Sequence, residues 1–191
     1  MNIKLKRAVT LSMMLAIAVV LNIVEYYFTG FIPVPGAKLG LANIVVLIVL
    51  YTFGFKEAFA IAVLRVVIAS LLSPGRFLSP TFYMALAGGI LSVLVMWLFK
   101  KVKFFGITGV SLFGSLAHVL GQVVVGYFLI GEGLLVWLPL MLVLGIITGF
   151  LIGLIARQFL NTTKDWLSKE LINPKHNKEE KNENSDDDFT F

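Results

Sequence analysis

Six long runs of apolar residues constrain the fold of this chain more than any other feature. They cover residues 8–28, 39–53, 58–72, 81–99, 110–130 and 134–155. A helix needs roughly 20 predominantly apolar residues to cross the hydrocarbon core of a membrane. Hydrophobic residues make up 58% of the 191 positions and charged residues only 14%, a composition that is far too apolar for a soluble domain. The sequence therefore predicts an all-α integral membrane protein, a bundle of six transmembrane helices.

The second and third runs are short for a full span. A short helix crosses a membrane if it tilts little, borrows flanking residues, or lies where the protein thins the bilayer. In an alternative arrangement, residues 39–72 form a re-entrant pair, and only four helices span the membrane. The number of crossings is even in both cases, so the two termini are expected on the same side.

The basic residues predict which side that is. Cytoplasmic loops of membrane proteins are enriched in Lys and Arg. With both termini inside, the inner segments hold thirteen of these residues, whereas the outer loops hold only Lys38 and Arg76. We therefore expect both termini in the cytoplasm.

The last residues of the chain have a different composition. Residues 161–191 are polar and rich in Lys, Glu, Asp and Asn, and such a segment cannot bury a core. The chain is predicted to divide into a six-helix transmembrane domain, residues 1–160, and a polar, disordered cytoplasmic tail, residues 161–191.

Arg65 lies in the middle of the third apolar run. An arginine at the centre of a spanning helix costs at least about 2.5–3.5 kcal/mol, so its side chain is expected to face the bundle or a water-filled cavity and to have a partner. One explanation is a structural ion pair or a clamp on backbone carbonyls. The other is a role in ligand binding or gating.

Two polar residues stand three positions apart near the outer end of the first helix, Asn22 and Glu25. This spacing places them on one helical face, and Glu25 is the only carboxylate within the six runs. A pair between Glu25 and Lys38 or Arg65 would neutralise both charges and is the structural explanation. Alternatively, these groups form the polar floor of a pocket that opens to the outside.

The two cationic outer loops have a similar composition. Residues 31–43 contain two prolines, Gly36, Gly40, Lys38 and Asn43, and residues 73–80 contain Pro74, Gly75, Arg76 and Pro80. Proline fixes the backbone and glycine permits close approach. Each loop is either a stiff connector or a lid that binds an anionic or head group.

In the fifth run, His118 and Gln122 lie four positions apart on one face. Polar side chains of this kind either join helices in a membrane or contact a ligand. The chain has no cysteine and only two histidines, so we expect no metal site and no cofactor.

Small residues recur at helical spacing in two of the runs. Gly145, Gly149 and Gly153 in the sixth run are expected to pack against another helix of the bundle. Ala8, Ser12 and Ala16 in the first run form a similar stripe, which could instead contact the helix of a partner subunit.

The segment at residues 35–44 reads Pro-Gly-Ala-Lys-Leu-Gly-Leu-Ala-Asn-Ile. Other short motifs are Arg65, residues 87–89 with Ser92 and Met96, and residues 109–111 leading to 118–122. Together these motifs resemble the Gx transporter family, which is also catalogued as heptaprenyl diphosphate synthase component I. Val119 departs from the family pattern, in which asparagine often follows the histidine.

This resemblance implies a bundle similar to the substrate-binding S components of energy-coupling factor transporters, in a bacterial cell membrane. Such a subunit takes up a small molecule with a transmembrane T component and two ATPase subunits as partners, and Ala8, Ser12 and Ala16 match its T-component contact. We expect an anionic or aromatic small-molecule ligand. The protein itself is expected to contact membrane lipid and to bind no nucleic acid. The residues expected to line or gate the site are Asn22, Glu25, Lys38, Asn43, Arg65, Arg76, His118 and Gln122.

We do not expect the chain itself to be an enzyme. It has no phosphate-binding loop of the Gly-x-x-x-x-Gly-Lys-Ser/Thr type. It also has no aspartate before Asp165, whereas a prenyl diphosphate synthase needs carboxylates to hold magnesium against pyrophosphate. The alternative function is a non-catalytic accessory role in prenyl or quinone metabolism or in flavin-based extracellular electron transfer, with which relatives are associated.

Overall fold

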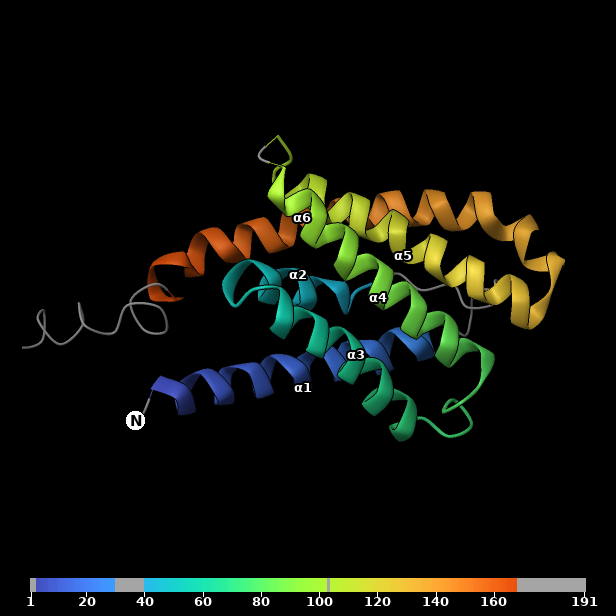
Figure 1. Ribbon diagram of the computed structural model, residues 1–191, viewed down its shortest axis with the longest axis horizontal. Helices are drawn as coiled ribbons and strands as arrows, with labels where there is room; N and C mark the ends of the chain where they lie inside the picture. The colour runs from blue at the N-terminus through green and yellow to red at the C-terminus, as the bar shows by residue number, and fades with distance from the viewer. Residues whose placement is uncertain (1–2, 30–39, 103, 168–191) are drawn as a thin grey trace, which may run out of the picture.

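The computed structural model describes residues 3–29, 40–102 and 104–167. These residues form six α-helices and one 3-10 helix, and the described part of the chain contains no strand, which confirms the all-α prediction (Figure 1). The elements are α1 (Ile3–Thr29), α2 (Asn43–Thr52), α3 (Phe55–Leu72), α4 (Pro80–Lys101), α5 (Ile107–Ile130), η1 (Glu132–Trp137) and α6 (Leu138–Leu167). Each of the six apolar runs corresponds to one α-helix, and α6 extends into the segment predicted to be the tail.

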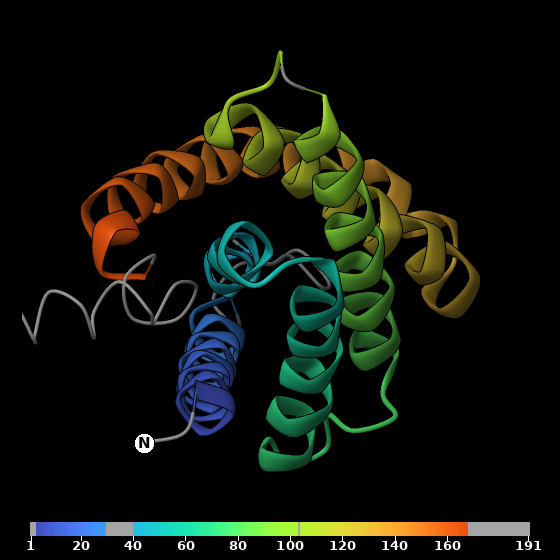
Figure 2. The same cartoon turned by 60° about the vertical axis from the view of Figure 1, so that its left-hand side comes forward.

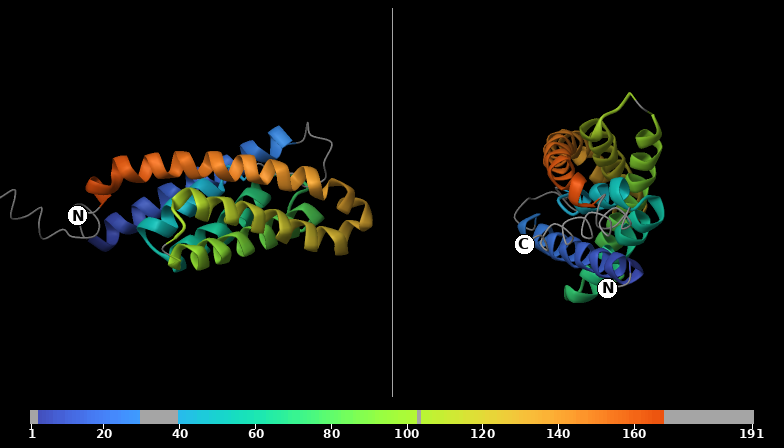
Figure 3. Two further views of the ribbon diagram at one scale, coloured as in Figure 1. Left: turned by 90° about the horizontal axis from the view of Figure 1, so that it is seen from above. Right: turned by 90° about the vertical axis from the view of Figure 1, so that its left-hand side faces the viewer.

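Successive helices run in opposite directions, so the bundle has two distinct ends. The start of α1, the α2–α3 turn, the α4–α5 connection and the end of α6 lie at one end, which we call the terminal end (Figure 1; Figure 3, left). The α3–α4 loop and η1 lie at the opposite end, which we call the loop end. The described ends of the chain therefore share one end of the bundle (Figure 1).

Four of the six α-helices are long and apolar enough to cross a membrane. The qualifying segments are Lys4–Phe28, Pro80–Lys101, Ile107–Ile130 and Glu132–Thr163. The other two helices are α2, which has only 10 residues, and α3, which has 18 residues and carries Lys56, Glu57 and Arg65. These long apolar helices make the chain a membrane-embedded protein.

The short helix α2 forms the centre of the bundle. It contacts α1, α3, α4 and α6, and Figure 2 shows it enclosed by its neighbours. Residues 45–50 are all buried. A helix that is apolar on all sides belongs in a core, and ten residues extend about 15 Å, roughly half the thickness of the hydrocarbon region.

Glycine allows the outer helices to pack closely. A Cβ atom at Gly88 of α4 would lie 2.8 Å from the backbone oxygen of His118, and one at Gly121 of α5 would lie 2.9 Å from the backbone oxygen of Ala87. The predicted small face of the sixth run also packs inside the bundle. Gly149 and Gly153 lie against α5, where the Ser111 hydroxyl donates a hydrogen bond to the Gly149 carbonyl at 2.8 Å.

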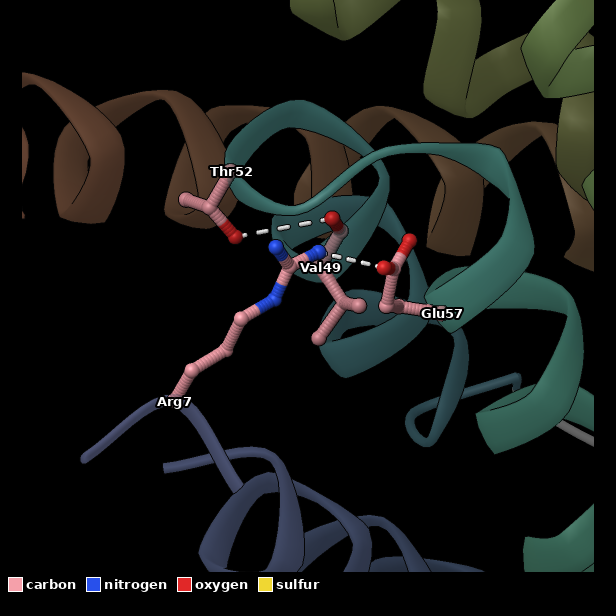
Figure 4. A network of polar contacts seen from close by, with 4 residues as sticks. All are labelled: Arg7, Val49, Thr52 and Glu57. Carbon is pink, nitrogen blue, oxygen red and sulfur yellow. Dashed lines mark hydrogen bonds and ion pairs between the residues drawn. The ribbon is translucent and has the colours of Figure 1, made fainter. Parts of the chain in front are cut away.

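Charged side chains join the helices at the terminal end. The Arg7 guanidinium of α1 donates to the Glu57 carboxylate at the start of α3, next to the end of α2, where Thr52 contacts the Val49 carbonyl (Figure 4). From the last turn of α4, Lys100 donates to the carbonyl of Leu50 at 2.7 Å. These contacts place the α2–α3 turn level with the first turns of α1 and the last turn of α4.

Candidate functional site

A short non-helical segment is buried just before α2. Gly40, Ala42 and Asn43 are buried and Leu41 is exposed, and residues 40–42 lie outside any helix. Gly40 adopts a φ of +75°, a conformation that favours glycine. Its N–H donates a hydrogen bond to the Glu25 carboxylate of α1. A buried backbone N–H needs a hydrogen-bond partner, and the Glu25 carboxylate is that partner for Gly40.

Arg65 reaches the start of α2 from the neighbouring helix α3. Its guanidinium donates a hydrogen bond to the side-chain oxygen of Asn43 at 2.5 Å, and its side chain is only 2% exposed. It also interacts electrostatically with Glu25. The prediction that Arg65 faces the bundle and has a partner is confirmed, and the partners are an amide and, through space, a carboxylate.

Arg76 points into the bundle from the α3–α4 loop. Its side chain is 1% exposed and donates to the Asn22 side-chain oxygen of α1 at 2.8 Å. The guanidinium carbon lies 4.5 Å from the centre of the Tyr26 ring, within the range of a cation–π interaction. Burial lowers the pKa of the Arg76 guanidinium below its ordinary value, and the electrostatic interactions with Tyr26 and Glu25 oppose that shift.

These contacts define a polar cluster around the start of α2. It consists of Asn22, Glu25, Asn43, Arg65 and Arg76, which come from α1, α2, α3 and the α3–α4 loop. All five side chains are buried. Arg65 lies ten residues after the start of α3, or about 15 Å along the helix from the charged terminal end. The cluster thus extends from the middle of the bundle toward the loop end.

His118 and Gln122 of α5 pack against α4 at Gly88, next to the glycine that lies near Arg65. A Cβ atom at Gly88 would lie 2.8 Å from Gln122 Cγ and 3.1 Å from His118 Cε1, whereas one at Gly89 would lie 3.8 Å from Arg65 Nη2. The glycine pair therefore lets α3 and α5 bring polar groups against neighbouring faces of α4. Gln122 is 1% exposed, and neither its amide nitrogen nor its oxygen has a hydrogen-bond partner among the described residues.

Several buried polar atoms of the cluster, and of three serines in α3, the α3–α4 loop and α4, also lack hydrogen-bond partners within the described ranges. The nitrogens are Arg65 Nε, Arg76 Nε, Arg76 Nη1 and Asn43 Nδ2, and the hydroxyl oxygens belong to Ser70, Ser73 and Ser92. Buried polar groups in proteins are hydrogen-bonded in the great majority of cases. Such a concentration of unused donors is typical of a site that is completed by another molecule.

The structure brings together most of the residues that the sequence predicts to bind a ligand. Asn22, Glu25, Asn43, Arg65 and Arg76 share the cluster, His118 and Gln122 lie across α4, and Lys38 lies outside the described residues. Sequence reasoning did not assign roles to Tyr26 or to the Gly40 N–H. Only the positive φ of Gly40, which a sequence does not display, explains why its amide turns toward Glu25.

The predicted partner stripe lies on the outside of the molecule. Ala8, Ser12 and Ala16 of α1 are all exposed. Only 22% of the apolar segment of α1 is buried, against 50% of that of α5. The outer face of α1 is therefore available to lipid or to another subunit.

Comparison with known proteins gives one match. The family model described as heptaprenyl diphosphate synthase component I matches residues 14–159. No curated protein and no solved structure matches the chain. The matched range contains the whole polar cluster and both halves of the α4–α5 contact.

Proposed function

The chain belongs to the heptaprenyl diphosphate synthase component I family, whose model covers well over half of it, and on that premise we propose that it is a substrate-binding subunit of a small-molecule uptake transporter. In this proposal it resembles the S components of energy-coupling factor transporters, and separate ATPase subunits power the uptake. The substrate site is lined or gated by Asn22, Glu25, Lys38, Asn43, Arg65, Arg76, His118 and Gln122.

The observation that carries this proposal is the buried position of Arg65. Its guanidinium lies in the interior of an apolar bundle, bonded to an amide and with Nε unused. An ionisable residue at such a depth is expensive and usually marks a binding site or a pathway. A purely structural ion pair would instead place a carboxylate directly on the guanidinium.

The proposed orientation follows the charges. Arg7, Lys56, Lys100 and Lys101 gather at the terminal end, and basic residues favour the cytoplasmic side. We place the terminal end in the cytoplasm, the loop end outside, and the protein in the bacterial plasma membrane with six crossings. The α2–α3 hairpin then reaches the cytoplasmic surface, and the polar cluster is approached from outside.

In this proposal, uptake also requires partner subunits that hydrolyse ATP. The family description names a component, and the chain contains neither a phosphate-binding loop nor an aspartate before Asp165. We propose that it is non-catalytic and that a T component docks on Ala8, Ser12 and Ala16, with two ATPase subunits attached. The small residues of this stripe permit close helix contact.

A second candidate function follows from the family description itself. A protein named as a component of a prenyl synthase could be a membrane accessory in prenyl or quinone metabolism, or in flavin-based extracellular electron transfer. In that case the protein would associate with an enzyme or redox protein, and the polar cluster would only hold helices together.

Copurification from the native host separates the two functions. The wild-type protein should bring down a T component and two ATPases, and Ser12→Phe should lose them because a large ring blocks close helix contact. Met13→Phe is the matched control, since Met13 is also exposed on α1 but lies outside the stripe. Copurification of a prenyl synthase or redox protein, unchanged by Ser12→Phe, would contradict the transporter proposal.

A further inference from the structure

The groups around the start of α2 carry more positive than negative charge. Arg65 and Arg76 are both almost fully buried, and Glu25 is the acidic residue that interacts with each of them. Among acidic residues whose side chains are described, Glu57 pairs with Arg7 at the terminal end and Glu132 is exposed on η1. One carboxylate therefore faces two guanidiniums.

The sequence of the neighbouring segment does not restore the balance. Residues 30–39 contain Lys38 and no acidic residue, so wherever they lie they cannot contribute a second carboxylate. Arginine stays protonated in proteins, and a buried charge is strongly unfavourable unless it is paired. No described residue supplies the negative charge that would balance the second guanidinium.

The unpartnered nitrogens of the cluster favour a negatively charged ligand, as its excess positive charge does. Within the polar cluster, the nitrogens without partners among the described residues are Nε of Arg65, Nε and Nη1 of Arg76, and Nδ2 of Asn43. All of these are donors. In addition, Asn43 is the first residue of α2, and the start of a helix favours an anion. A ligand that matches these donors has several acceptor oxygens and a negative charge.

We propose that Arg65, Arg76 and Asn43 bind an oxyanion, a carboxylate or phosphate group, next to Glu25. Glu25 neutralises one guanidinium and accepts the hydrogen bond from the Gly40 N–H. The oxyanion neutralises the other guanidinium. This inference rests on the proposed function, because it assigns the class of substrate that the subunit takes up. The same chemistry is found in a free solute and in the headgroup of an anionic lipid.

Thermal unfolding of the purified full-length protein tests the site directly. The protein is placed in phosphatidylcholine nanodiscs and titrated with inorganic phosphate or acetate, with chloride at equal ionic strength as the control. Phosphate or acetate should raise the unfolding temperature above the chloride control. Arg65→Met should weaken that binding at least about tenfold, since a hydrogen bond to a charged group is lost. Arg157→Met, an exposed arginine of α6, should respond like the wild type.

Two further comparisons distinguish an anion site from a structural arginine. Without added anion, Arg65→Met should unfold at or above the wild-type temperature, because it removes an uncompensated buried charge. If Arg65→Met does not fold, Arg65→Lys takes its place. It keeps the charge but loses Nε, and it should also bind phosphate or acetate more weakly than the wild type.

The source of the oxyanion is identified in nanodiscs that contain phosphatidylglycerol. Stabilisation by this lipid alone, absent in the Arg65 variant, would support the site and assign it to a lipid headgroup. The proposal is overturned if neither the salts nor the lipid stabilise the protein, or if the Arg65 variant responds like Arg157→Met. If ATPases copurify but no anion stabilises the protein, the transporter function is supported and the anion site is overturned. If an anion stabilises the protein but no ATPases copurify, the anion site is supported and the transporter function is contradicted.

Discussion

At the scale of single residues, Arg65 marks what a sequence can and cannot reveal. Its place within an apolar run predicts that it faces inward and needs a partner. The identity of that partner depends on the α2–α3 turn, which brings Asn43 to within 2.5 Å although it stands 22 positions earlier in the chain. The sequence also offered Glu25 as a partner for Arg65, and only the fold shows that the Asn43 side chain accepts the hydrogen bond.

Glu25 provides the first prediction. Glu25→Gln leaves two buried guanidiniums without a carboxylate, and removing one partner of buried charges costs about 3–5 kcal/mol. We expect a clear drop in the unfolding temperature of the purified protein, partly reversed by added phosphate. Glu132→Gln, on the exposed surface of η1, should change stability by less than about 0.5 kcal/mol. If the two variants change the unfolding temperature equally, Glu25 does not stabilise the two buried guanidiniums.

Gly40 provides the second prediction, with Gly75 as its matched control. Both have a φ above +70°, at +75° and +72°, so alanine costs about 1–2 kcal/mol at either position. Only at Gly40 would the new Cβ also lie 3.2 Å from Asn43 Nδ2, whereas Gly75 has open space. Both variants should unfold at lower temperature, but only Gly40→Ala should weaken phosphate binding. If the two variants bind phosphate equally well, Gly40 does not contribute to the anion site.

At the scale of elements, α2 begins later than its prediction. The apolar run 39–53 predicts a spanning helix, but the helix begins only at Asn43. An apolar pattern does not distinguish helical residues from buried irregular ones, and residues 40–42 are held by the φ of Gly40 and the Glu25 contact. The helices α3, α4 and α5 begin and end within three residues of their predicted limits, whereas α1 begins earlier, at Ile3, and α6 begins at Leu138 and continues to Leu167.

The α4–α5 contact gives an element-scale prediction. Gly88→Ala would place a methyl group 2.8 Å from a backbone oxygen of α5 that cannot move aside, whereas at Gly89 the nearest atoms are 3.6 Å away or more. Overpacking typically costs about 1–3 kcal/mol. We expect Gly88→Ala to lower the unfolding temperature and Gly89→Ala to leave it unchanged or higher, since alanine favours a helix. Equal destabilisation by both would argue against the close α4–α5 packing.

At the scale of the whole molecule, the charges predict a sidedness that labelling can measure. The chain has no cysteine, so single cysteines can be introduced at Pro74 in the α3–α4 loop and at Gly106 before α5, both exposed. In intact cells a membrane-impermeant maleimide should label Pro74→Cys. Gly106→Cys should react only after the cells are permeabilised. The opposite pattern would place the polar cluster toward the cytoplasm and invert the proposed direction of approach.

The central claim is that the buried polar cluster holds a ligand rather than only joining helices. Native mass spectrometry of the protein, purified from its native host in mild detergent, tests this most directly when the wild type is compared with Arg65→Ala. The account predicts a bound small molecule on the wild type that is absent from an equally folded Arg65→Ala protein. A wild-type protein without any bound molecule, together with an Arg65→Ala variant that fails to accumulate, would contradict it and make Arg65 a structural residue.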